Sequence, residues 1–245
     1  MKENKSSRKI IIAVCAVVLA GALAVVGVFV VAPAVRFSMA SNLAEQNPAE
    51  AFAAFERLGD YRDARVRMRE LQQQVIASRS QPTMEFGGMN WLVLEERGGR
   101  ALLLLEEPIG DRAYHEALID ITWEGSNIRT YLNGMFFNRF DEEYQARVVE
   151  TDIVNSNNAT FGTRGGNDTE DRVFLLSLAE AALYFDSATA RVARMNNSNV
   201  FWWLRSPGME PMIAATVRSD GELGNAGSGV NAPERTIRPA MWVRL

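Results

Sequence analysis

The chain has 245 residues, of which 26 are Lys or Arg and 30 are Asp or Glu, so its formal net charge is −4 at pH 7. It contains one histidine and one cysteine, which excludes His-rich zinc sites and an internal disulfide framework. The acidic balance also argues against nucleic acid or anionic lipid as a partner, because phosphate groups repel an anionic surface.

The N-terminal segment predicts a membrane anchor. Residues 10–35 form an apolar run without a charged side chain, longer than the about 20 residues that cross the hydrocarbon core of a bilayer. Four basic residues precede this run: Lys2, Lys5, Arg8 and Lys9. Because basic residues before a span stay in the cytoplasm, we expect a cytoplasmic tip at 1–9, a transmembrane helix at 10–35 and a single-pass, N-in, C-out protein in the cell membrane. A cleaved signal peptide is the alternative, although its apolar core would span about 7–15 residues.

The remainder of the chain, residues 36–245, is then expected outside the cytoplasm. Its residues include no cysteine, because the single Cys15 lies in the apolar run. Eukaryotic extracellular domains usually carry disulfides, so this composition favours a bacterial surface protein. Residues 1–35 hold four basic residues and one acidic residue, which leaves 22 basic against 29 acidic outside, a net charge of about −7.

Residues 36–81 predict a helical hairpin. Apolar residues recur at helical spacing on both sides of Gly59-Asp60, which indicates two helices of about 15 residues joined by a turn. The segment 51–64 resembles the tetratricopeptide-like "LGDY-x-DA" sequence of bacterial membrane-anchored proteins, but one copy is too short for a solenoid. We expect a stalk that holds the next domain off the membrane. The alternative is a hairpin that binds a partner through its uncovered apolar face.

Residues 82–245 carry strand and turn signals with a few capped helices between them. Ser126 and Asp141 are expected to cap two helices, and Ser177 with Glu180 forms a capping box. Strands are expected at 90–96, 101–105, 172–176, 200–205, 213–219 and 236–245. Helices enter early, strands finish, and long loops separate them, so the fold class is α+β.

Six short motifs follow one another in this domain. They are Thr122-Trp123; Ser126-x-x-Arg129-x-Tyr131-Leu132-Asn133; Gly165-Gly166-x-Asp168-Thr169; Val173-Phe174-Leu175-Leu176-Ser177; Trp202-Trp203-Leu204-Arg205-Ser206-Pro207-Gly208; and Ile237-Arg238-Pro239-Ala240. Together they resemble the bacterial domain of unknown function 6273 over about residues 84–245. That family has no assigned activity. The resemblance implies a C-type-lectin-like fold, which formylglycine-generating enzymes share.

Catalytic side chains are scarce in this domain. His115 is the only histidine, and no nucleophile-elbow motif accompanies it. Without cysteines the domain lacks the copper ligands that formylglycine-type oxidation needs, and Cys–His catalysis is excluded. We therefore expect a domain that is not an enzyme. An enzyme that uses carboxylates or His115 is the least favoured hypothesis.

A polar segment at 165–171 is the one candidate for a metal site. Asp168 and Asp171, with Asn167 and Glu170, place oxygen ligands around a position that suits calcium. The alternative is that these residues make ordinary turn and cap hydrogen bonds, and the spacing does not match an EF-hand. No other cofactor is expected.

The predicted strand 200–205 contains two adjacent tryptophans. Strand alternation places Trp202 on one face, and Trp203 and Arg205 on the other, so one indole is expected in the core and the other is covered by a loop or stacks on a sugar or peptide. Arg205 is expected to pair with a carboxylate such as Asp168 or Asp171.

The small, polar segment 224–233 is predicted to be a loop. By the lectin-like resemblance, the corresponding loop displays the ligand site, which makes Asn225, Ser228 and Asn231 binding candidates together with Trp203 and Arg205. The leading hypothesis is a membrane-anchored recognition domain at a bacterial surface that binds glycan or protein through its C-terminal loops. The alternative is a structural subunit of an envelope complex that docks through the helical hairpin.

Overall fold

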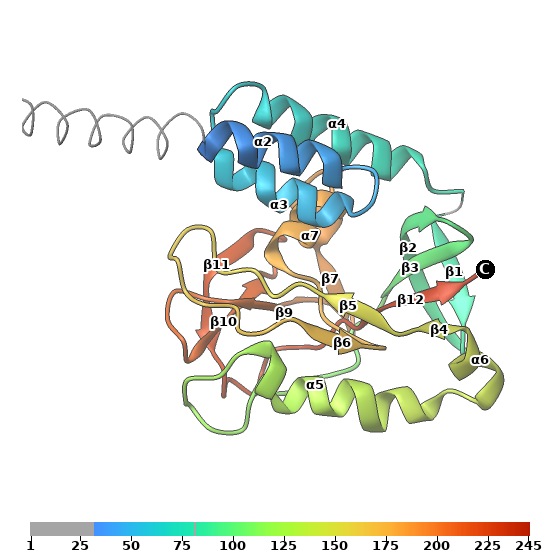
Figure 1. Ribbon diagram of the computed structural model, residues 1–245. Helices are drawn as coiled ribbons and strands as arrows, with labels where there is room; N and C mark the ends of the chain where they lie inside the picture. The colour runs from blue at the N-terminus through green and yellow to red at the C-terminus, as the bar shows by residue number, and fades with distance from the viewer. Residues whose placement is uncertain (1–31, 81) are drawn as a thin grey trace, which may run out of the picture.

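A computed structural model describes residues 32–80 and 82–245 (Figure 1). The predicted cytoplasmic tip at 1–9 and all but the last four residues of the predicted transmembrane helix at 10–35 lie outside these residues. Over the two described ranges, no helix is long and apolar enough to cross a membrane.

Three helices form a layer on one side of the molecule: α2 (Ala32–Leu43), α3 (Pro48–Leu58) and α4 (Ala64–Ala77). The hairpin expected at 36–81 is therefore a set of three helices. Asn47 causes the additional break, because its side chain caps α3 by accepting a hydrogen bond from the backbone N–H of Glu50 (3.2 Å). Pro48 then takes the first helical position, where its missing N–H is tolerated.

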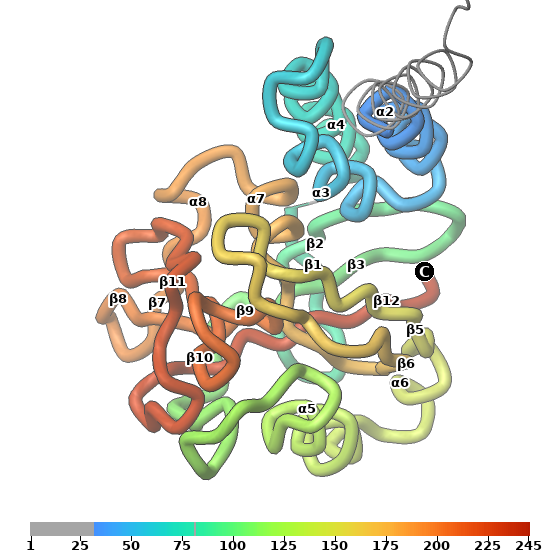
Figure 2. The backbone as a smooth tube through the Cα atoms, turned by 60° about the vertical axis from the view of Figure 1, so that its left-hand side comes forward, coloured from blue at the N-terminus to red at the C-terminus, as the bar shows by residue number. Residues whose placement is uncertain are grey.

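The helical layer packs on the rest of the domain. Both α3 and α4 contact α7 (Leu178–Tyr184), which Figures 1 and 2 show directly beneath them. Gln72 on α4 donates hydrogen bonds to the carbonyl oxygens of Ala182 (2.8 Å) and Phe185 (3.0 Å). Phe55 belongs to the same hydrophobic core as the sheets. The helices α3 and α4 are thus docked on the domain through α7, and the expectation that residues 36–81 hold the domain off the membrane stays a prediction.

The main sheet has five antiparallel strands in the order β1-β2-β3-β12-β4. Their bounds are β1 Thr83–Phe86, β2 Met89–Arg97, β3 Arg100–Leu105, β4 Val148–Val149 and β12 Ala240–Arg244. The hairpin predicted at 90–105 is confirmed, and Gly98 and Gly99 adopt positive φ angles (55° and 70°) in its two-residue turn. The strand β12 lies between β3 and β4, although it is formed far later in the sequence.

A second sheet contains β9 (Trp202–Pro207), β10 (Ile213–Val217) and β11 (Leu223–Gly229), with β10 in the centre. The strand β11 occupies most of the segment predicted as a loop at 224–233. Small residues allow it to approach β10 closely, because a Cβ atom at Gly227 (φ 81°) would collide with the backbone of Ala214. The glycines that suggested a loop therefore serve a tightly packed strand.

The remaining elements connect the two sheets. They are the hairpins β5 (Thr151–Ile153) with β6 (Thr169–Asp171) and β7 (Ala193–Met195) with β8 (Ser198–Val200), and the helices α5 (Asn127–Tyr131), α6 (Glu142–Arg147) and α8 (Ala188–Arg191). Ser126 caps α5, and the capping box between Ser177 and Glu180 is confirmed. The strand expected at 172–176 is instead a buried extended segment with one bridge, from Phe174 to Ala240. The α+β class is confirmed, with several small sheets.

Candidate functional site

A cleft of about 360 Å³ lies between the helical layer and the rest of the domain. One wall is α3, and the opposite wall is the segment 151–160 together with the start of β11. The N-terminal end of α7 and part of β9 complete the lining. In Figure 1, α3 lies above the segment around β5 and β11, with α7 between them. The cleft is thus built by segments distant in sequence.

An ion pair between Arg205 and Glu180 forms the inner part of the cleft. Arg205, on β9, is buried, and its guanidinium contacts the carboxylate of Glu180 with two nitrogens, one of them Nη2 at 2.8 Å from Oε1. Its Nη1 also donates to the carbonyl oxygen of Leu175 (2.8 Å). Glu180 is fixed in turn, because it accepts a hydrogen bond from the backbone N–H of Ser177 (2.7 Å). A bidentate pair held in this way is a rigid polar surface for a ligand.

Carboxylates without an ion-pair partner belong to the lining of the cleft. Four of them line it without an ion-pair partner among the residues that the structure describes: Glu50, Glu56, Asp152 and Glu222. Desolvation raises the pKa of the Glu56 carboxyl above its usual value, although the charge of Arg57 opposes this shift.

The guanidinium groups that line the cleft are already engaged. Arg57 donates to the hydroxyl of Ser156 (2.7 Å), and Arg97 pairs with Glu95 (3.2 Å). Arg205 pairs with Glu180. The hydroxyl of Ser156 leaves the charge of Arg57 in place, so the five carboxylates of the lining face three guanidinium groups, and this net charge of −2 attracts a cationic group.

Asn158 fixes the wall opposite α3. Its buried side-chain amide donates to the carbonyl oxygens of Pro207 and Asn225, both at 2.9 Å, so it joins the segment 151–160 to β9 and β11. Its Oδ1 accepts a hydrogen bond from the backbone N–H of Thr160 (2.9 Å). Sequence reasoning missed this residue, since an asparagine in a polar stretch is typical of any turn.

Two of the five predicted binding residues line the cleft. Arg205 is at its inner end, and Asn225 is in its wall, where its amide donates to the hydroxyl of Thr160 (3.3 Å). Ser228 lies further along β11, with its hydroxyl accepting a hydrogen bond from Arg235 (3.3 Å). Asn231 is exposed in the turn after β11. These last two residues are not part of the cleft lining.

Trp203 does not present its ring to a ligand. Both Trp202 and Trp203 are 0 % exposed, and the indole N–H of Trp203 donates to the carbonyl oxygen of Arg112 (2.8 Å). One tryptophan was expected in the core, and both rings are found there. The loop that contains Tyr114 covers the ring of Trp203 on its face of the strand. Stacking of Trp203 on a sugar or peptide is thereby excluded in this conformation.

Asp171 is a hydrogen-bond acceptor for several structural donors. Its Oδ1 accepts from Arg129 Nε (2.7 Å) and Asn133 Nδ2 (3.2 Å), and its Oδ2 from Trp123 Nε1 and Thr169 Oγ1, both at 2.8 Å. These donors take the positions that a calcium ion would need. The carboxylate also does not pair with Arg205, contrary to the expectation, because Glu180 lies closer to that arginine.

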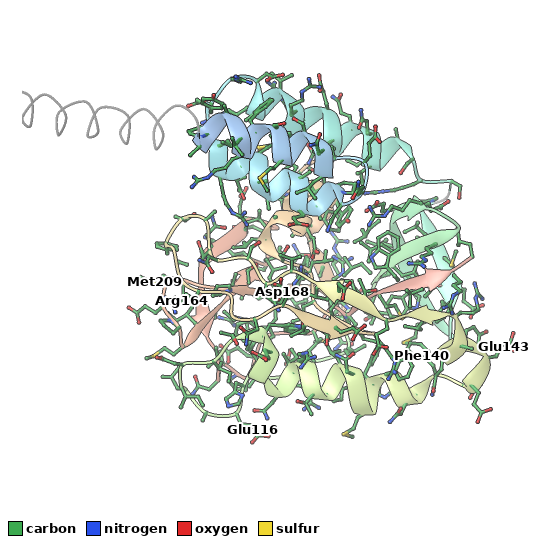
Figure 3. The ribbon with its side chains drawn as sticks, in the orientation of Figure 1. Glu116, Phe140, Glu143, Arg164, Asp168 and Met209 are labelled. Atoms are coloured by element: carbon green, nitrogen blue, oxygen red, sulfur yellow. The ribbon has the colours of Figure 1, made fainter. Side chains whose placement is uncertain are left out.

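Asp168, labelled in Figure 3, is exposed just before β6. Its Oδ1 accepts a hydrogen bond from the backbone N–H of Asn155 (2.8 Å), as the turn interpretation of this segment predicts. In the part of the chain that the structure describes, no three His, Cys, Asp or Glu side chains are grouped to hold a metal ion. His115 is partly buried in the loop that bonds to Val230, away from the cleft.

Comparison with known proteins gives one match. Residues 98–245 match the family described as Domain of unknown function (DUF6273). The chain belongs to this family. No curated protein and no solved structure matches the chain. The DUF6273 segment begins in the turn between β2 and β3, so it supplies Glu180, Arg205 and Asn158 to the cleft. The helix α3 precedes the segment, and the cleft therefore combines the family's domain with a helical layer outside the matched residues.

Proposed function

We propose that this DUF6273 protein is a membrane-anchored recognition protein of a bacterial surface that binds its ligand in the cleft between α3 and the domain. The apolar run at 10–35 supplies the anchor in this proposal. The observation that carries the binding function is the cleft itself, whose lining combines the rigid Arg205–Glu180 pair with four carboxylates that form no ion pair among the described residues.

The charge of the cleft favours a ligand that carries a positive group. Five carboxylates line the cleft against three guanidinium groups, two of which, those of Arg97 and Arg205, are held in ion pairs. Neutral polar side chains, among them Asn157 and Asn225, supply hydrogen bonds to hydroxyl or amide groups. A basic peptide segment of a protein, or a glycan that bears amino groups, matches this combination.

Binding is favoured over catalysis by the residues that line the cleft. Among the described residues there, no histidine, cysteine or lysine is present, so catalysis would have to use the carboxylates or the serine hydroxyls. The alternative function, a structural subunit that docks through the helices of 36–81, required an uncovered apolar face. Phe52, Phe55 and Leu71 are buried where these helices pack, which leaves that alternative less support.

We retain the C-type-lectin-like fold as part of the proposal. Two features support it: strands from the beginning and the end of the domain pair in one sheet, since β3 contacts β12, and a second small sheet carries the Trp202-Trp203-Leu204-Arg205 sequence. We do not retain the expectation that one long loop at 224–233 forms the ligand site, because most of that segment belongs to the strand β11.

The function is tested with a fragment of residues 32–245, which contains the hydrophobic core as far as the structure describes it. Peptide and glycan arrays should yield ligands that carry Lys, Arg or amino-sugar groups, and binding should weaken as salt is raised. The double variant Glu56→Gln/Glu222→Gln should weaken binding at least about tenfold, which corresponds to about 1.4 kcal/mol. The matched control is Glu142→Gln/Glu143→Gln on α6, which removes the same charge outside the cleft (Glu143 in Figure 3). Ligands that respond equally to both double variants, or an array without any ligand, would contradict the proposal.

A further inference from the structure

Arg238 is a second buried arginine, and its surroundings differ from those of Arg205. It precedes β12 and is 2 % exposed. Its Nε donates to the carbonyl oxygen of Leu105 (2.8 Å). Within the described ranges this is its one side-chain hydrogen bond, it has no ion pair, and its Nη1 is buried without a partner. A guanidinium can donate five hydrogen bonds, so most of this capacity is unused.

The aromatic neighbours of Arg238 do not replace a counter-ion. The guanidinium carbon lies 5.3 Å from the ring centre of Trp202 and 5.9 Å from that of Phe185. Such cation–π contacts attract the cation to the faces of the rings, but they leave the N–H donors without acceptors. A buried charge without a partner costs several kcal/mol. Burial lowers the pKa of Arg238 to about 10, so the group is still protonated at neutral pH.

A surface cavity of about 730 Å³ reaches Arg238. Its inner surface includes the buried residues Leu105 and Pro108, and its rim is formed by β2 and by the segment from α8 to the β7–β8 turn. Arg194 is a second cation of the rim, and three amide side chains accompany it: Asn90, Asn196 and Asn197. None of the lining residues is shared with the cleft described above.

We propose that this cavity binds an oxyanion group, a carboxylate or a phosphate, for which Arg238 is the buried counter-ion. Nε of Arg238 is engaged with Leu105 and Nη1 is closed off, so Nη2 is the donor that the guanidinium offers to such a group, and the rim amides add further donors. Glu106 and Glu107 also line the cavity, and the charge of Glu106 raises the pKa of Arg238, but both carboxylates are exposed and neither forms an ion pair with it. The site is independent of the ligand that occupies the cleft.

The test measures the melting temperature of the fragment 32–245 in sodium phosphate, in sodium acetate and in sodium chloride at equal ionic strength. Phosphate or acetate should raise the melting temperature in a saturable manner, as expected for a ligand that binds the folded state, and chloride should not. The anion that gives the larger shift identifies the chemistry. The NMR signal of the Arg238 Nε–H group should move with the same anion.

Variants of the rim keep the proposal testable even if Arg238→Met does not fold. Arg194→Gln should weaken anion binding about threefold or more, and Glu106→Gln should strengthen it, while Arg218→Gln, a matched change outside the cavity, should do neither. Equal melting temperatures in all three salts would overturn the proposal. A second result would also overturn the proposal: Glu106→Gln destabilises the protein without added anion, and phosphate raises the melting temperature of this variant alone. Glu106 itself would then be the counter-ion of Arg238.

Discussion

Tyr184 and Glu95 are joined by a hydrogen bond across the core, from the hydroxyl of Tyr184 on α7 to Oε2 of Glu95 on β2 (2.8 Å). Glu95 is only 3 % exposed. Burial raises the pKa of its carboxyl, which Arg97 (3.2 Å) and the hydrogen bond from Tyr184 oppose. A carboxyl group at this position is therefore more easily protonated in the folded protein than in the unfolded chain.

Glu95→Gln should stabilise the protein at neutral pH. Since the folded pKa of Glu95 is raised, its favourable contribution is complete below the ordinary glutamate pKa of 4.5 and is lost as the pH rises through the folded value. Glutamine keeps an acceptor for Tyr184 without the charge. The stability advantage of the variant over the wild type should thus be present at pH 7 and shrink as the pH approaches 4.5. Urea titrations across this range check it, with Glu143→Gln as an exposed control. An advantage that grew on acidification would contradict the assignment.

Asp171→Asn should destabilise the protein by about 3 kcal/mol, because it breaks a buried charge-assisted pair with Arg129 and weakens the bond from Trp123. Calcium chloride or a chelator should leave the melting temperature of the wild type unchanged, since the oxygens of Asp171 already accept four donors. Differential scanning calorimetry measures both effects. A calcium-dependent stabilisation abolished by Asp168→Asn would show instead that the segment 165–171 binds the metal.

Trp202→Ala and Trp203→Ala should each cost about 3–5 kcal/mol in the free energy of unfolding, because both indoles are fully buried. Trp203→Ala also leaves the carbonyl oxygen of Arg112 without its donor. Chemical denaturation of the two purified variants gives the comparison. If one of them kept near-wild-type stability, its ring would be a surface group and the covering loop would be misplaced.

Arg79→Met should loosen the helical layer. The side chain of Arg79 donates to the carbonyl oxygens of Leu94 (2.8 Å) and Tyr184 (2.7 Å), so it ties the end of α4 to β2 and α7. Loss of these charge-assisted bonds should cost about 2 kcal/mol. Limited proteolysis should show faster cleavage near residues 78–82, whereas the exposed control Arg69→Met should be cleaved at the wild-type rate. Equal cleavage rates would mean that the layer is held without Arg79.

Local signals in the sequence accounted for elements whose cause is local. The capping box of Ser177, the cap at Ser126 and the Gly98-Gly99 turn each depend on a few adjacent residues, and each was predicted in place. The class of fold followed from the order of these elements. The strand β11 was not predicted. Its small residues are required because the backbone of the neighbouring strand β10 lies too close for larger side chains, and that neighbour is known only from the tertiary structure.

The candidate site was harder to predict for the same reason. The sequence predicts that Arg205 pairs with a carboxylate, and the structure contains such a pair. Which carboxylate it is, Glu180, depends on how α7 is placed over β9. Nothing in the spacing of residues 48–58 indicates that α3 forms the facing wall of a cleft. The docking of the helical layer is a tertiary event, and a sequence pattern only shows that an apolar face exists.

The central place of β12 in its sheet has a consequence for biosynthesis. The hairpin of β2 and β3 leaves the ribosome early. The strand β3, which contains Leu102, Leu103, Leu104 and Leu105, then forms an edge of the sheet, because its neighbour β12 consists of residues 240–244. At translation rates of about 5–20 residues per second, that edge waits on the order of ten seconds for its neighbour. A nascent chain with an exposed, leucine-rich strand edge is prone to pair with other chains. Pairing with another chain is thus most favoured before the last strand, β12, has been synthesised.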